Sequence, residues 1–119
     1  MSTETILNQS SITFLENYLN NASPTGFEAE GQKLWMDYVR PYVDTFITDT
    51  YGTAVGVINP DAPYNVVIEG HADEIAWYVN YITDDGLVYV IRNGGSDHQI
   101  APSKRVNIHT KKGIVKGVF

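Results

Sequence analysis

Apolar positions near the start of the chain recur at helical spacing. Over residues 12–19 they fall three or four positions apart, and polar residues fill the positions between them. An α-helix places such residues on one face, so the spacing predicts a helix that ends near Asn20. Ser10 or Ser11 is expected to cap its first turn, because a hydroxyl oxygen can accept a hydrogen bond from an unpaired backbone N–H.

A second helix is predicted after a proline-containing break. Thr25 and Glu28 have the spacing of a capping box, in which each side chain satisfies a backbone N–H near the other residue. Apolar residues over 27–39 then occupy one helical face. Pro41 is expected to end this helix, because its ring cannot continue the helical hydrogen bonding.

The period then changes to that of strands. Residues 43–48 and 53–58 flank a turn at 49–52 and predict a hairpin, and prolines mark 59–63 as a loop. The apolar run that begins at residue 65 predicts a strand through the residues that follow, as far as Tyr81. Beyond it, turn signals at 84–86, 93–95 and 111–113 separate short β-rich runs at 87–91, 105–110 and 114–119.

This order of elements predicts an α/β unit followed by a small β domain, with the seam near residues 79–82. The final strand, 114–119, is apolar and has no turn or polar tail after it. A domain seldom ends on an exposed apolar strand, because the strand leaves an open sheet edge. We therefore expect the chain to be the N-terminal portion of a longer protein.

Composition narrows the function classes. The chain of 119 residues has no cysteine, so thiolate metal sites, disulfides and cysteine nucleophiles are excluded. Its net charge of −6 argues against a nucleic-acid binder, which needs a basic surface along phosphates. The N-terminus lacks a signal-peptide pattern, and no apolar run approaches the roughly 18 residues of a membrane span. We expect a cytoplasmic protein that binds no membrane.

The strongest chemical signal follows the apolar run. Gly70, His71, Asp73 and Glu74 stand where ligands collect in open α/β sheets, beyond the carboxyl end of a strand. Alternation along the strand places His71 and Asp73 on one face and Glu74 on the other. A carboxylate beside a histidine is a common arrangement around metals, because it orients the ring. From the residues alone, His71 is either a metal ligand or a histidine held by a strand-end partner.

In order along the chain, these motifs resemble the glutamyl or tetrahedral aminopeptidase family of metallopeptidases. The resemblance spans essentially the whole chain and rests on the segments SPTGFE (23–28), DTYG (49–52), GHADEI (70–75), NGG (93–95), RVNIHT (105–110) and GIVKGV (113–118).

The resemblance implies an α/β/α metallopeptidase catalytic domain, of which residues 1–79 are the N-terminal part. Residues 80–119 would begin an inserted β-barrel lid or dimerisation domain. The family carries two divalent metal ions, usually zinc, cobalt or manganese, and removes N-terminal residues from peptides through a metal-activated water. By this likeness His71 would bind one metal, and Asp73 would be the catalytic carboxylate that orients His71 and tunes the water. Family members often form homo-oligomers, from dimers to tetrahedral shells of twelve subunits.

The chain departs from the family pattern in two ways. The remaining metal ligands and the general-base glutamate of the family come from a segment after the inserted domain, and the chain ends before that segment. A glycine commonly follows the Asp-Glu-Ile run, where this chain has Ala76 and Trp77. We therefore expect the 119 residues alone to be inactive, which peptidase turnover and bound metal measured on the purified fragment would test.

Other residues receive less specific interpretations. Glu74 is expected to be a structural hydrogen-bonding partner, and Glu69 has no assigned role. His98 and His109 lack ligand-like spacing and are expected to be solvated or packed. The tyrosines and tryptophans suggest packing more than a sugar platform.

Two other functions stay open. One is a non-catalytic assembly or interaction module. The other is an endoglucanase-like glycoside hydrolase, whose chemistry needs two facing carboxyls roughly 5–10 Å apart. Adjacent strand residues such as Asp73 and Glu74 face opposite ways, so this second alternative is the weaker one.

Overall fold

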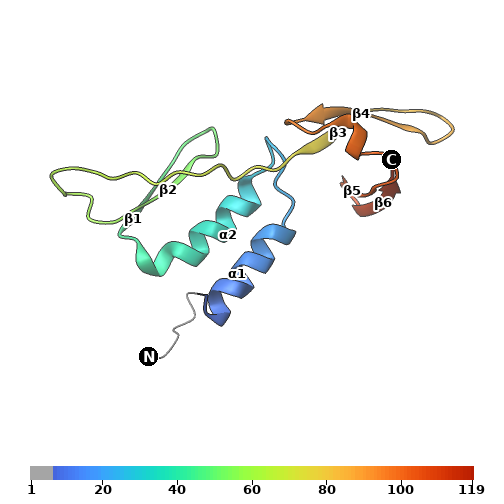
Figure 1. The fold of residues 1–119 in the computed structure, drawn as a ribbon. Helices are drawn as coiled ribbons and strands as arrows, with labels where there is room; N and C mark the ends of the chain where they lie inside the picture. Colours follow the sequence, from blue (N-terminus) through green and yellow to red (C-terminus); the bar gives the residue numbers. More distant parts are fainter. Residues whose placement is uncertain (1–6) are drawn as a thin grey trace. The chain divides into compact units, whose positions relative to one another are not determined.

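The computed structural model describes residues 7–119, which form two compact units (Figure 1). The first unit ends at Glu74 and contains both long helices and one strand pair, and the second spans Ile75–Phe119. The predicted seam near residues 79–82 falls inside β3 (Ala76–Ile82), which lies wholly in the second unit because it pairs with β4 (Val88–Asn93). The assignment of residues 80–119 to an inserted β-barrel stays a prediction.

Both predicted helices are present, but their caps differ from the prediction. Helix α1 spans Gln9–Asn20, and the N–H of Ser11 donates to Asn8 Oδ1 at 2.9 Å, so Asn8 rather than Ser10 or Ser11 is the cap. Asn8 caps the helix because a cap side chain accepts from the N–H two or three residues after it, and Ser11 is three residues after Asn8.

Helix α2 spans Ala29–Val39 and has no side-chain cap, so the predicted capping box is also wrong. The Glu28 carboxylate does reach back and accepts from the N–H of Gly26 at 2.6 Å. The hydroxyl of Thr25 does not cap the helix, because it donates to the carboxylate of Asp73. The helix ends where Pro41 was predicted to end it, in the short 3-10 helix η1 (Arg40–Tyr42).

Aromatic side chains join the elements of the first unit. The rings of Phe14 and Tyr38 stack with centroids 4.0 Å apart, and the Tyr38 hydroxyl donates to Ser11 Oγ at 3.0 Å. The ring of Trp35 in α2 meets that of Phe46 edge-on at 6.4 Å, which brings α2 against the hairpin. Such contacts add to the stabilisation from burial of aromatic area.

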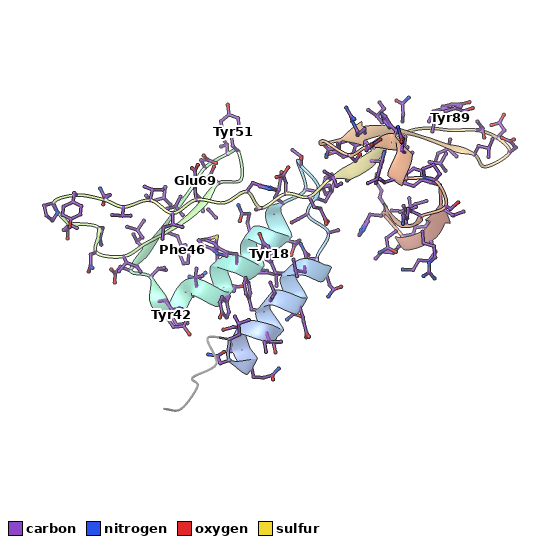
Figure 2. All side chains as sticks on the ribbon, viewed as in Figure 1. Tyr18, Tyr42, Phe46, Tyr51, Glu69 and Tyr89 are labelled. Carbon is purple, nitrogen blue, oxygen red and sulfur yellow. The ribbon has the colours of Figure 1, made fainter. Side chains whose placement is uncertain are left out.

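The predicted hairpin forms. Strand β1 (Thr45–Thr48) pairs antiparallel with β2 (Ala54–Val57), and the chain reverses at a turn that places Gly52 at a φ of 86°. The Asp49 carboxylate accepts from the N–H groups of Tyr51 and Thr53 at 2.9 and 3.0 Å. These hydrogen bonds, led by that of Thr53, lower the pKa of Asp49. Tyr51 projects from the turn and is 93% exposed (Figure 2).

The second unit has the predicted strands and turns. Strands β3 and β4 pair antiparallel with a register shift between Val79 and Tyr81, and β5 (Arg105–Thr110) pairs with β6 (Gly113–Val118). A short 3-10 helix, η2 (His98–Ile100), lies between the two pairs in sequence. The rings of Trp77 and Phe119 meet edge-on with centroids 4.8 Å apart.

The strand predicted from residue 65 is wrong over its first half. Residues 65–73 belong to no strand, and Val66 and Ile68 are 81% and 96% exposed. An apolar strand of this kind lies inside a sheet, with neighbours that pair its backbone and cover both faces. Among residues 7–119 no strand pairs with this segment, and the isolated bridge between Pro24 and Glu74 comes just after it. The segment is therefore extended without being part of a sheet.

Apolar surface is widely exposed in both units. No apolar side chain among residues 7–119 is fully buried, and each sheet that these residues form has two strands. A two-stranded sheet is at best marginally stable in water without a packed face. These elements therefore need further apolar surface against them to be stable. No helix within the described range combines the length and apolar composition that crossing a membrane requires.

Candidate metal-ligand site

The structure brings His71 and Asp73 together as predicted. His71 Nδ1 lies 2.9 Å from Asp73 Oδ1, although the segment that carries both residues is not a strand. The imidazole is 86% exposed and the Asp73 side chain 35% exposed. The pairing therefore leaves most of the ring, including the side that bears Nε2, accessible to a ligand.

The charge on Asp73 decides which ring nitrogen is available. The Thr25 hydroxyl and then the His71 ring hydrogen-bond to this carboxylate and hold the pKa of Asp73 below its ordinary value of 3.8. An ionised carboxylate only accepts hydrogen bonds, so in this contact Nδ1 carries the proton. With the proton on Nδ1, a neutral ring presents its lone pair on Nε2, and this is the form in which histidine binds metals. The pair fits one histidine ligand of a divalent metal.

Glu74 acts as a structural partner, as the sequence predicted. Its Oε1 accepts from the N–H of Ser23 at 2.8 Å, and its own N–H donates to the Ser23 carbonyl at 2.9 Å. With the bridge between Pro24 and Glu74, these bonds hold residues 23–25 alongside 73–74.

Thr25 is the residue that sequence reasoning missed at this site. It was assigned to a helix cap, but its hydroxyl donates to Asp73 Oδ2 at 2.5 Å, across 48 positions of sequence. No local pattern could have revealed this contact. The one available signal was that the segments of Thr25 and Asp73 both belong to the family motifs.

A shallow depression of about 210 Å³ lies next to the pair. Its lining includes His71 and Asp73 together with Tyr18 and Asn21 from the end of α1. Tyr18 of the first unit is labelled in Figure 2. Glu69, also labelled there, lies on the exposed segment just before His71. The depression gives the imidazole an open approach from solvent.

The other candidate residues do not join this pair into a metal site. His98 lies in η2 and His109 in β5, and both are exposed, in keeping with solvated side chains. Within residues 7–119 no group of three or more histidine, aspartate or glutamate side chains is placed to hold a metal ion. The described residues thus offer one candidate ligand, His71, and a carboxylate in contact with its ring.

Comparisons with known proteins agree with the motifs. The sequence model of the M42 glutamyl aminopeptidase family matches residues 52–119, more than half of the chain. The chain is 28% identical over 109 residues to FrvX of Escherichia coli (strain K12), and the alignment covers 91% of this chain and 30% of FrvX. It is 26% identical over 105 residues to lysyl aminopeptidase of Pyrococcus furiosus, covering 87% of this chain and 30% of that relative.

A solved structure shares the fold. The TET aminopeptidase of a marine sediment archaeon of the Thaumarchaeota matches with a TM-score of 0.85 and 26% identity, over 90% of this chain and 30% of that one. This likeness confirms the predicted fold class, part of an α/β aminopeptidase domain. The chain spans about 30% of the length of the curated relatives it matches. The family match, these relatives and the His71–Asp73 pair lead to one conclusion: the chain belongs to the M42 family of glutamyl aminopeptidases.

Proposed function

We propose that the full-length protein is a metal-dependent aminopeptidase that uses two divalent metal ions and releases N-terminal residues from peptides. The observation that carries the proposal is the His71–Asp73 contact, which gives a histidine the proton arrangement of a metal ligand. Zinc, cobalt and manganese are the proposed metals, and of these zinc is a metal that imidazole suits. Membership of the family supplies the peptide substrate class.

In this proposal each residue of the site has one role. His71 holds one metal through Nε2, and Asp73 holds the Nδ1 proton and keeps the ring in its binding orientation. When bound, the metals supply Lewis-acid activation of water and of the scissile carbonyl. Glu74 takes no part in the chemistry, because its carboxylate anchors the backbone of Ser23. The open depression beside His71 leaves room for a peptide terminus.

Metal removal tests this function. Dialysis of the full-length protein against a chelator should abolish release of nitroaniline from aminoacyl-nitroanilides, and added zinc, cobalt or manganese should restore it. The metal content of each sample is measured alongside the rate. Full activity in a sample shown to be metal-free would contradict the proposed metal dependence. Absence of turnover in the metal-loaded protein would contradict the proposed activity and favour the non-catalytic module.

The glycoside hydrolase alternative gains no support from the geometry. Its mechanism needs two carboxyls that face each other across a glycosidic bond. Asp73 is hydrogen-bonded to Thr25 and His71, and Glu74 is hydrogen-bonded to Ser23. Neither carboxylate is therefore arranged as half of such a pair.

We also propose that the protein assembles into homo-oligomers. The support is the likeness to a TET aminopeptidase. The acidic net charge continues to argue against nucleic acid as a partner.

A further inference from the structure

We propose that Thr25 is a positioning residue of the metal site, whose hydroxyl locks the Asp73 carboxylate in the orientation that aims His71 at the metal. The inference rests on the proposed function, since it assigns His71 as a ligand. The contacts among Thr25, Asp73 and His71 orient the His71 ring without a bound metal.

The two oxygens of Asp73 have different partners. Oδ2 accepts from the Thr25 hydroxyl and Oδ1 lies 2.9 Å from His71 Nδ1. The intrinsic torsional preference about the terminal bond of an aspartate is broad, so hydrogen bonds decide its orientation. Rotation of this carboxylate breaks two hydrogen bonds, where without Thr25 it would break one. Because the orientation of the His71 ring follows Oδ1, the Thr25 hydroxyl indirectly fixes the direction of Nε2.

The backbone delivers Thr25 to this place. Residues 23–25, which we call the strap, are tied to Glu74 by two hydrogen bonds, one in each direction, at 2.8 and 2.9 Å. The parallel bridge between Pro24 and Glu74 sets the register, so that Thr25 reaches Asp73 when Ser23 meets Glu74. The strap and the motif therefore form one frame, although about fifty positions of sequence separate them.

Helix α2 holds the strap from the other side. Ser23 is only 7% exposed, and Gly31 in the first turns of α2 is also buried. A Cβ on Gly31 would lie 2.4 Å from Ser23 Oγ, closer than atoms can approach, so the helix backbone packs directly on the strap. A larger residue at position 31 would force the Ser23 side chain to shift. The strap is thus packed against α2 at Ser23, two residues before Thr25.

The test compares two substitutions in the full-length protein. Thr25→Val keeps the size and branching of the side chain and removes the hydroxyl, whereas Thr25→Ser keeps the hydroxyl. Zinc affinity is measured by competition with a chromophoric chelator, and kcat and KM are measured on an aminoacyl-nitroanilide. For Thr25→Val we expect zinc affinity to fall by about 10-fold or more, the range for partners that orient a ligand, and kcat to fall more than KM rises. Thr25→Ser should stay within about twofold of wild type.

A matched control comes from the second unit. The Thr83 hydroxyl donates to the Asp85 carboxylate in a turn, so Thr83→Val removes the same kind of hydrogen bond away from the motif. This variant should bind zinc as wild type does. Wild-type zinc affinity in Thr25→Val would overturn the proposal, and so would a loss in Thr25→Ser as large as in Thr25→Val.

The variant His71→Ala separates this inference from the proposed function. Loss of zinc in His71→Ala with normal affinity in Thr25→Val would refute the role of Thr25 and leave the metal function standing. Retention of all zinc in His71→Ala would refute the assignment of His71 as a ligand, on which this inference rests.

Discussion

Replacement of His71 by alanine is expected to remove one metal ion from the full-length protein and to lower kcat/KM on aminoacyl-nitroanilides by roughly a thousandfold or more. The reason is that a bound metal contributes several kcal/mol of transition-state stabilisation, and each 1.36 kcal/mol corresponds to a factor of ten. The imidazole is also 86% exposed in this structure, so its removal leaves no cavity among residues 7–119. Metal content by elemental analysis and steady-state kinetics measure the two effects.

Histidines of the second unit provide the control for this experiment. His98 and His109 are exposed and lie outside the motif, so alanine at either position should leave metal content and activity unchanged. Full metal occupancy and full activity in His71→Ala would remove the basis for assigning His71 as a ligand.

Substitution of Asp73 by asparagine is expected to weaken metal binding by roughly 10-fold to 100-fold and to lower kcat/KM by a similar factor. The carboxylate accepts at both oxygens, from Thr25 at Oδ2 and from His71 at Oδ1. An amide offers one acceptor oxygen, and it loses the negative charge that holds the proton on Nδ1 and raises the basicity of Nε2. Zinc competition and nitroanilide hydrolysis report the two losses.

Glu74 offers a neighbouring substitution with the same change of charge. In Glu74→Gln the side chain keeps an oxygen that can accept from the N–H of Ser23, so the strap should stay in place. This variant should bind zinc within about twofold of wild type. Equal losses in Asp73→Asn and Glu74→Gln would mean that net charge near the site, and not the contact with His71, controls metal affinity.

Local features were predictable from the sequence because their causes lie within a few residues. The turn that joins β1 and β2 depends on Asp49, which accepts from N–H groups two and four positions ahead, and on Gly52, which adopts a positive φ. The contact of His71 with Asp73 follows from side chains two positions apart in an extended segment. Both were predicted correctly.

Non-local features were not predictable in this way. The hydrogen bond from Thr25 to Asp73 joins residues 48 positions apart, and no spacing pattern in the sequence records it. The segment from residue 65 has the composition of a buried strand, and such a strand needs paired neighbours and packed faces. Val66 and Ile68 are exposed, so no neighbouring element within residues 7–119 covers their side chains as that composition implies. Composition indicates what a segment can form, and its neighbours decide whether it forms.

The central claim is that His71 binds a divalent metal through Nε2 while Asp73 holds Nδ1. Anomalous diffraction at the zinc edge from crystals of the zinc-loaded full-length protein tests it most directly. The claim predicts an anomalous peak about 2.0–2.1 Å from His71 Nε2, the usual length of a bond between zinc and a histidine nitrogen, with Nδ1 still within hydrogen-bonding distance of Asp73. Zinc peaks that are all remote from His71, or a bond from zinc to Nδ1, would contradict it.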